Sequence, residues 1–207
     1  STPGTITFVG TVGEEGLGDL RGVKRLFSDS MKDRIDRFIS IDGQGLGVTH
    51  IAIGSTRFRV TFKGPGGHSF GSFGIVNPIH ALGRAMARIA DFQVPHSPRT
   101  TFSVGRIGGG TSINAIASDA WMEVDLRSGD PAALRSLEKQ LRQAVNDAVA
   151  QENSRWNSGA LTVSIETVGS LPAGRLPPSA PIVQTAISVS KALNLPLSFS
   201  EGSTDAN

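Results

Sequence analysis

The amino-acid sequence predicts an α+β fold, in which a ferredoxin-like βαββαβ domain is inserted into an α/β domain. The first observation is the order of patterns between residues 55 and 168: strand, helix, strand, strand, helix, strand. The second is that residues 1–54 and 169–207 each carry further apolar strand or helix patterns. We therefore expect the two outer blocks to form one domain, with the middle block inserted between them.

Four strands and two helices account for the middle block. Each helix is predicted to begin at a capping side chain followed by proline, at Asn77-Pro78 and at Asp130-Pro131. Two helices on one face of an antiparallel sheet follow from this order of elements. The strands, marked by period-two alternation of apolar residues, are centred on residues 58–62, 102–104, 122–126 and 161–165.

The outer blocks carry the patterns of an α/β domain. The predicted strands are residues 5–12, 38–41 and 48–53, and the predicted helices lie near residues 20–27 and 180–193.

Composition argues against several classes of function. A net charge of +2 without a long Lys/Arg run argues against nucleic-acid binding. RNA binding on a ferredoxin-like sheet would also need exposed aromatic residues, whereas Tyr is absent and Phe residues fall on inward-facing positions. The absence of Cys excludes disulfides and Cys-ligated zinc, and it fits a cytoplasmic protein. No apolar run reaches membrane-spanning length and no signal peptide is recognised, so no membrane partner is expected.

Two adjacent carboxylates, Glu14 and Glu15, follow the first predicted strand and are flanked by glycines. Adjacent carboxylates repel each other, so at least one of them needs a cation or a proton. A metal ion would serve, with one carboxylate binding the metal and the other accepting a proton from water. An acidic first turn of a helix is the alternative interpretation. Asp42 follows the next predicted strand, where it is either a turn residue or a second carboxylate ligand.

His68 lies in a glycine-rich loop that lets a ligand approach the backbone closely. A histidine presented in this way can hydrogen-bond an oxyanion. A phosphate-binding loop is less well supported, because no Lys-Ser/Thr pair follows, and an ordinary exposed histidine is the remaining alternative. The other three histidines have no comparable setting and are interpreted as structural: His50, His80 and His96.

A second glycine-rich loop, residues 108–110, precedes Asn114. Three consecutive glycines between strands suggest that something passes close to the backbone, and Asn114 offers both a donor and an acceptor. Arg127 ends the next predicted strand, where it could bind a carboxylate through two hydrogen bonds. An ion pair with Asp125 or Glu123 is the alternative interpretation of Arg127.

Taken together, these motifs resemble one family, the M20 metallopeptidases, which include acetylornithine deacetylases, succinyl-diaminopimelate desuccinylases, carboxypeptidase G2-like enzymes, aminoacylases and peptidase T. The resemblance covers essentially the whole chain and rests on the order of five motifs. These are Gly13-Glu14-Glu15-Gly16, Ile41-Asp42-Gly43, Gly66-Gly67-His68-Ser69, the segment from Gly109 to Ile116, and Asp125-Leu126-Arg127.

The resemblance implies a zinc-dependent hydrolase with two zinc ions, acting on the amide bond of small peptides or N-acyl amino acids. It implies that the ferredoxin-like block, residues 55–168, is a lid that forms a homodimer through a helix and an edge strand. The lid is expected to close over the site on hinges near Gly54 and Gly169. Each motif then has an implied role: Glu14 is the general base, Glu15 and Asp42 are zinc ligands, His68 stabilises the oxyanion, and Asn114 and Arg127 bind the substrate carboxylate.

The chain departs from the family pattern in its metal ligands. The His-x-Asp motif, the bridging Asp and the last His of the family have no counterpart here. Because stable zinc sites usually need three or four protein ligands, the outer blocks are expected to form an incomplete catalytic domain. The chain alone is then expected to be inactive and to bind zinc poorly. A non-catalytic dimerisation or ligand-binding module is the alternative function.

Overall fold

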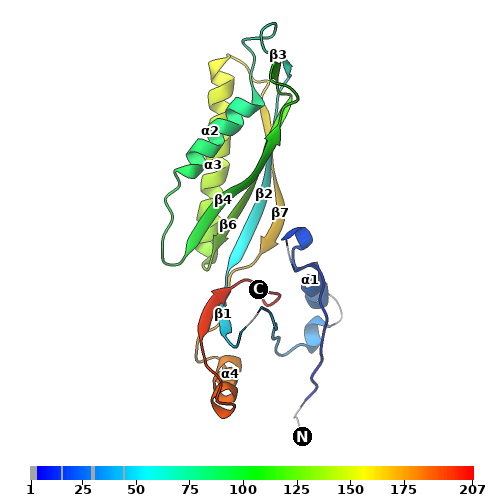
Figure 1. Ribbon diagram of the computed structural model, residues 1–207, viewed down its shortest axis with the longest axis vertical. Helices are drawn as coiled ribbons and strands as arrows, with labels where there is room; N and C mark the ends of the chain where they lie inside the picture. The colour runs from blue at the N-terminus through cyan, green and yellow to red at the C-terminus, as the bar shows by residue number, and fades with distance from the viewer. Residues whose placement is uncertain (1–3, 15, 29–30, 44) are drawn as a thin grey trace. The chain divides into compact units, whose positions relative to one another are not determined.

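The computed structural model describes residues 4–14, 16–28, 31–43 and 45–207 (Figure 1). The chain divides into two compact units, residues 53–174 and residues 1–52 together with 175–207. The middle unit ends six residues later than the predicted boundary at 168, because its last strand continues to Leu171. None of the described helices is long and apolar enough to span a membrane.

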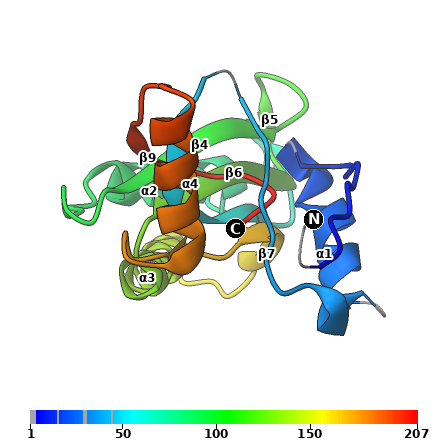
Figure 2. The same cartoon turned by 90° about the horizontal axis from the view of Figure 1, so that it is seen from below.

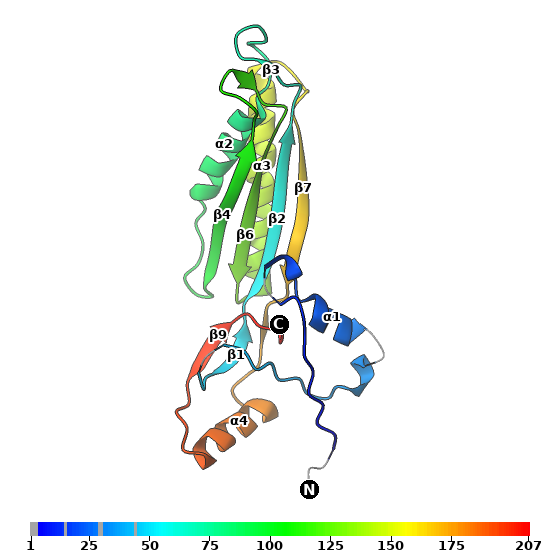
Figure 3. The ribbon, with the colours of Figure 1, turned by 45° about the vertical axis from the view of Figure 1, so that its right-hand side comes forward.

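The middle unit is a four-stranded antiparallel sheet with strand order β4-β6-β2-β7. Figures 1 and 3 show α2 and α3 together on one side of this sheet. The chain order is βαββαβ, which confirms the predicted ferredoxin-like arrangement. The elements are β2 (Gly54–Lys63), α2 (Pro78–Ala90), β4 (Thr100–Gly109), β6 (Asp119–Ser128), α3 (Pro131–Arg155) and β7 (Thr162–Leu171).

Alternation along the central strands creates the core of this unit. Phe58, Val60 and Phe62 of β2 are buried, as are alternate residues of β6, and they pack against the apolar faces of α2 and α3. The intervening residues lie on the opposite surface of the sheet, called here the open face. Both predicted helix caps are present: the Ile79 amide donates to Asn77 Oδ1 at 2.9 Å, and the Ala132 amide donates to Asp130 Oδ1 at 2.7 Å.

Two short strands extend the middle unit beyond the main sheet. β3 (Gly67–His68) pairs with β5 (Ala115–Ile116) in an antiparallel ladder. This pair lies at the end of the sheet where β2 ends (Figure 1). We call β3, β5 and the loops 69–73 and 110–114 the tip. The tip was not predicted as strand structure, because two-residue strands leave no periodic pattern.

The second unit contains a small sheet of order β8-β1-β9, in which β1 and β9 are parallel. The predicted strand at 48–53 and the helices near 20–27 and 180–193 are confirmed, and α4, orange in Figure 2, packs against β1. The elements are a 3-10 turn (Gly16–Gly18), α1 (Arg21–Ser28), a second 3-10 turn (Lys32–Arg34), β1 (Val48–Ala52), β8 (Gly174–Arg175), α4 (Pro181–Ala192) and β9 (Phe199–Gly202).

Two strand predictions in this unit are wrong. Residues 5–12 and 38–41 form no strand. A strand needs a neighbouring strand to satisfy its main-chain N–H and C=O groups, and no described residues pair with these two segments. Their apolar side chains are therefore left exposed: Ile6, Phe8, Val9, Val12, Ile39 and Ile41.

The two glycines expected to act as hinges lie inside paired strands. Gly54 opens β2 opposite Ser128, and Gly169 of β7 pairs with Arg57. A Cβ at position 54 would lie 2.5 Å from the Ala173 amide nitrogen. The close approach of Ala173 therefore explains why position 54 is glycine, and no hinge is needed to explain it.

Candidate functional site

His68 is held at the tip by its own loop. Its imidazole is exposed, and the backbone amides of Phe70 and Gly71 both donate to its Nδ1 atom at 3.3 Å. The Ser72 amide donates to the His68 carbonyl at 2.9 Å, which closes a tight turn. The glycine-rich sequence at 66–67 is required here, since a Cβ at Gly67 would lie 2.7 Å from Ser72. The loop therefore orders the histidine side chain.

Asn114 lies next to His68, although the two are distant in sequence. In the β3–β5 ladder His68 is paired with Ala115, and the Ser69 amide donates to the Asn114 carbonyl at 2.9 Å. The Asn114 side chain is exposed, and its Oδ1 accepts a hydrogen bond from the Ser112 hydroxyl at 3.0 Å. The structure thus brings two of the predicted site residues together at one end of the middle unit.

The glycine run 108–110 serves the protein's own packing. A Cβ at Gly108 would lie 2.6 Å from the indole of Trp121, and one at Gly109 would lie 2.6 Å from Ala120 Cα. Gly109 and Gly110 also have positive φ angles, of 134° and 78°. The neighbouring strand and the Trp121 ring therefore explain these glycines, and no ligand close to the backbone is needed to explain them.

Trp121 lies on the open face of β6, on the side of the sheet opposite the buried Phe58 and Phe62. Its ring is covered by the guanidinium of Arg59, 3.8 Å from the ring centroid, and the Arg106 guanidinium lies 5.7 Å from it. Both arginines pair with Glu123, at 2.8 and 3.0 Å. The indole face is thus occupied by protein groups and is not a bare surface for stacking a nucleic-acid base.

Arg127 makes the ion pair that was the alternative interpretation of this residue. Its Nε donates to Asp125 Oδ2 at 2.6 Å, while Arg57 Nε donates to Asp125 Oδ1 at 3.2 Å. Two guanidinium groups therefore share one carboxylate at this end of the open face. Such a cluster retains the capacity to attract a substrate carboxylate. Sequence reasoning did not single out Arg57, although the spacing of Asp125 and Arg127 on one face of a strand indicated their contact.

Asn114 and Arg127 lie at opposite ends of the middle unit. The tip adjoins the beginning of β6, where the Gly110 amide donates to the Asp119 carbonyl at 3.3 Å. Arg127 is near the other end of the same strand. At about 3.3 Å per residue, the stretch from Asp119 to Arg127 spans about 26 Å. One small carboxylate therefore cannot contact Asn114 and Arg127 of the same chain.

The predicted carboxylates lie in the other unit, and they form no metal site among the described residues. Glu14 is half-buried and has an interaction partner, whereas Asp42 is exposed beside Gly43, whose φ is 70°. Glu15 lies outside the described residues. No group of three or more His, Cys, Asp or Glu side chains among the described residues could hold a metal ion. These residues therefore do not fit a complete zinc site.

Asp205 joins the C-terminal segment to the segment preceding Glu14, a contact that sequence reasoning did not find. The Thr11 hydroxyl hydrogen-bonds to Asp205 Oδ2. The other oxygen, Oδ1, is buried and has no hydrogen-bond partner among the described residues. A polar turn in the sequence carries no signal of this long-range pairing, so only the structure shows it.

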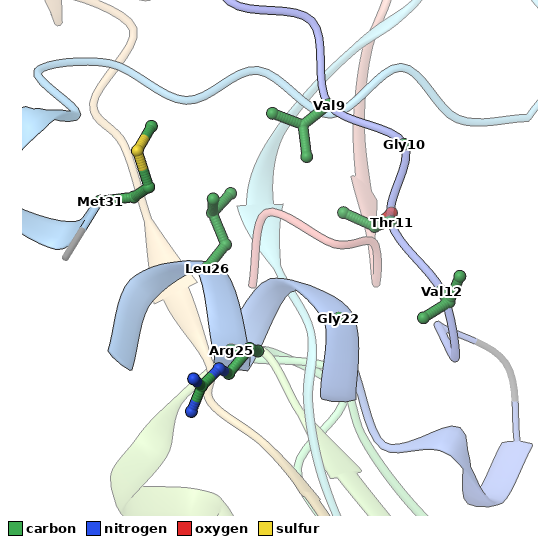
Figure 4. Close-up of a pocket in the computed structure, with 8 residues that line it drawn as sticks. All are labelled: Val9, Gly10, Thr11, Val12, Gly22, Arg25, Leu26 and Met31. Carbon is green, nitrogen blue, oxygen red and sulfur yellow. The ribbon is translucent and has the colours of Figure 1, made fainter. Parts of the chain in front are cut away.

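A shallow depression lies between residues 9–12 and α1 (Figure 4). Its surface is largely apolar, and it contains none of the predicted site residues. It coincides with one of the apolar segments that lack a neighbouring strand, which makes it an uncovered packing surface. The lining residues are Val9, Gly10, Thr11, Val12, Gly22, Arg25, Leu26 and Met31.

Of the other three histidines, His50 packs within the second unit. His50 Nδ1 hydrogen-bonds to the Leu176 carbonyl at 2.8 Å, and its ring meets Phe199 edge to face at 5.2 Å between centroids. His80 and His96 are exposed.

Comparisons with known proteins agree with this fold. A family model described as the peptidase dimerisation domain, of the M20 type, matches residues 53–153. No curated protein sequence matches the chain. A tripeptidase from Staphylococcus aureus subsp. aureus Mu50 is 21% identical with a TM-score of 0.73, over 94% of this chain and 50% of that one. The aminopeptidase PepT from Bacillus cereus is 21% identical with a TM-score of 0.73, over 95% of this chain and 51% of that one.

An amidase of the hydantoinase/carbamoylase family from Burkholderia multivorans is also similar. It is 21% identical with a TM-score of 0.59, over 77% of this chain and 38% of that one. The chain thus spans about half the length, or less, of the solved structures it matches. At these identities the likeness establishes the fold, and the matched family model identifies the middle unit. The chain therefore carries the peptidase dimerisation domain of the M20 family.

Proposed function

We propose that the chain supplies the lid, with part of the catalytic domain, of a hydrolase that cleaves the amide bond of small peptides or N-acyl amino acids. The observation that carries this proposal is that the β3–β5 ladder places His68 and Asn114 close together at the exposed tip of a peptidase dimerisation domain. The similar solved structures include a tripeptidase, an aminopeptidase and an amidase, which supports the reaction class.

The polar residues of the lid divide into two groups with different tasks. In our proposal His68 donates a hydrogen bond to the oxygen that becomes negative when the amide carbonyl is attacked. Asn114 binds the substrate beside it through its side-chain amide. Arg127, with Arg57 close by on the shared Asp125, binds the substrate carboxylate. Glu14 is the proposed base that accepts the proton of the attacking water.

The tip residues and Arg127 act on one substrate only if they come from two different subunits. Because the tip and Arg127 are about 26 Å apart along β6, a single lid cannot apply both to a small molecule. A homodimer in which the tip of one subunit reaches the substrate held by Arg127 of the other removes this difficulty. The homodimer is therefore part of the proposed function.

The proposal also includes zinc dependence, although the described residues do not form a zinc site. Asp42 and Glu15 remain the proposed ligands from this chain. Further protein ligands are required, because a stable zinc site usually needs three or four of them. The chain by itself is expected to hold much less than one zinc ion per molecule when measured by elemental analysis after dialysis. Stoichiometric zinc in the chain alone would show that its own residues complete a site.

The test of the proposed reaction is substitution of His68 in the complete enzyme that this proposal requires. His68→Ala is expected to lower kcat for an N-acyl amino acid or dipeptide by about 100- to 1,000-fold, because one oxyanion donor is removed. His80→Ala, on an exposed position of α2, is the matched control and is expected to leave kcat unchanged. Equal activity of the two variants would contradict the role of His68.

A non-catalytic dimerisation module is the second candidate, and the lack of a metal-binding group among the described residues favours it. The two candidates differ in one measurable respect. A module would dimerise without any hydrolysis even when joined to a complete catalytic domain, whereas the proposed hydrolase would turn over substrate in a His68-dependent manner.

A further inference from the structure

The hydrogen bonds around the His68 ring use one of its two nitrogens. Nδ1 faces two backbone donors, the amides of Phe70 and Gly71, each at 3.3 Å. Both amides belong to the turn that the Ser72 amide closes on the His68 carbonyl. Nε2 has no hydrogen-bond partner among the residues that the structure describes, and the side chain as a whole is exposed. The loop amides therefore hydrogen-bond to Nδ1 rather than to Nε2.

A neutral imidazole carries its proton on one nitrogen and offers a lone pair on the other. If Nδ1 carried the proton, its N–H would point at two other N–H donors, which is unfavourable. If the ring were turned over, a carbon would face the same two amides and leave them without this acceptor. Only an unprotonated Nδ1 satisfies both amides. We propose that the loop 69–72 fixes neutral His68 in the Nε2–H tautomer, so that the tip presents a hydrogen-bond donor to its ligand.

Asn114, like His68, has an acceptor atom that takes part in a hydrogen bond within the tip. Its Oδ1 atom accepts a hydrogen bond from the Ser112 hydroxyl at 3.0 Å. The NH2 group of Asn114 therefore remains as the group that it offers outward. In each residue an acceptor atom takes part in a hydrogen bond within the tip, which leaves a donor, Nε2–H of His68 and the NH2 group of Asn114, for a ligand. The tip is built for a ligand atom that accepts hydrogen bonds, such as a carboxylate or a carbonyl oxygen that becomes an oxyanion.

This inference rests on the proposed function for its catalytic meaning, but the tautomer itself is a property of the folded chain. In the proposed reaction an Nε2–H donor is ready before the substrate arrives, and no proton has to move between ring nitrogens. The amides of Phe70 and Gly71 are then positioning groups that act through His68. Their effect is visible by spectroscopy in the absence of any substrate or metal.

The test is a two-bond 1H–15N NMR spectrum of the 15N-labelled 207-residue chain at mildly alkaline pH, about 8.5. The His68→Gln variant identifies the His68 signals by their loss. We expect the His68 nitrogen that couples only to Hε1, which is Nδ1, to have the shift of a fully unprotonated nitrogen. His80 and His96, both exposed, serve as internal references for rings that exchange between tautomers. An unprotonated shift on Nε2, or averaged shifts like those of His80 and His96, would overturn the proposal.

A pair of variants at one position tests the role of the loop amides. Gly71→Pro removes one donor, and we expect the His68 shifts to move towards those of the reference histidines. Gly71→Ala keeps the donor, and its Cβ would meet only His68 atoms at 4.0 Å, so the wild-type pattern is expected. Identical His68 shifts in both variants would show that the Gly71 amide does not select the tautomer. If the proline variant does not fold, the wild-type spectrum still decides the tautomer. A fixed Nε2–H tautomer in a chain whose complete enzyme shows no hydrolysis would contradict only the proposed function.

Discussion

At the scale of single residues, two arginines of the open face show how the surroundings decide what a guanidinium group contacts. Arg59 and Arg127 both lie on the open face and both pair with a carboxylate of β6. Arg59 covers the Trp121 ring at 3.8 Å and completes a packed cluster. Both carboxylates are shared by two arginines, Glu123 by Arg59 and Arg106 and Asp125 by Arg57 and Arg127. The two clusters therefore differ in the Trp121 ring, which packs against Arg59 and Arg106.

Gly108 offers a direct test of that packed cluster. Gly108→Ala is expected to destabilise the fold by about 1–3 kcal/mol, because a Cβ there would lie 2.6 Å from a Trp121 ring held by Arg59. Gly105→Ala on the same strand has no atom within 4 Å and is expected to change stability by less than about 0.5 kcal/mol. Chemical denaturation measures both.

A double-mutant cycle separates the indole from other causes. In a Trp121→Ala background the space beside residue 108 is open, so Gly108→Ala should cost much less than in the wild type. If the cost of Gly108→Ala is unchanged, the glycine is required for a reason other than the indole.

At the scale of elements, a buried carboxylate of α3 supports the loop that carries His68. Glu152 is fully buried and accepts hydrogen bonds from the Asn77 amide at 3.1 Å, Arg84 Nε at 3.2 Å and Trp156 Nε1 at 3.0 Å. The Trp156 ring meets Phe73 of the tip loop edge to face, with centroids 5.6 Å apart. Glu152 thus connects α2, α3 and the loop that orders His68.

Removing this carboxylate should weaken both the unit and the tip. Glu152→Ala is expected to cost about 3–5 kcal/mol, because three buried or half-buried donors lose their acceptor. Glu138→Ala, on the same helix, removes only a partly exposed pair with Arg142 and should cost less than about 1 kcal/mol. Denaturation gives the stabilities, and hydrogen exchange at Gly71 and Ser72 should accelerate in Glu152→Ala but not in Glu138→Ala. Unchanged exchange in both variants would show that Glu152 does not anchor the loop.

The predictability of the elements follows from what each one needs. The helices beginning after Asn77 and Asp130 were predictable because their caps and apolar spacing are local in sequence. The strands expected at 5–12 and 38–41 were wrong, because apolar composition cannot supply the neighbouring strand that a ladder requires. His68 and Asn114 were each recognisable from an unusual glycine-rich loop, but their contact depends on the β3–β5 pairing, which has no sequence pattern.

At the scale of the whole molecule, the peptidase dimerisation domain has two free sheet edges, β4 and β7. The β4 side carries exposed apolar residues, Ile107 at 57% exposed and Ile79 of α2 at 42% exposed. On β7, the exposed side chains at Ser164 and Glu166 are polar. An interface buries apolar side chains at its centre, so the proposed homodimer is expected to form through β4 and α2.

Charge introduced at each edge tests this assignment. Ile107→Glu is expected to raise the dimer dissociation constant by about tenfold or more, because it places two carboxylates in the paired interface. Ser164→Glu, on the opposite edge, is the matched control and should leave the dissociation constant unchanged. Sedimentation equilibrium measures both, and weakening by the β7 variant alone would place the interface on the other edge.

The central claim is that the tip of one subunit and Arg127 of its partner serve the same substrate. Mixing two inactive variants of the complete enzyme, His68→Ala and Arg127→Ala, tests it most directly. After subunit exchange, a mixed dimer contains one active site in which both groups are intact, so about one quarter of wild-type activity should return. If each site instead used His68 and Arg127 of its own chain, every site in the mixture would lack one group. Absence of any recovered activity, with exchange shown by mass spectrometry of tagged subunits, would contradict the account.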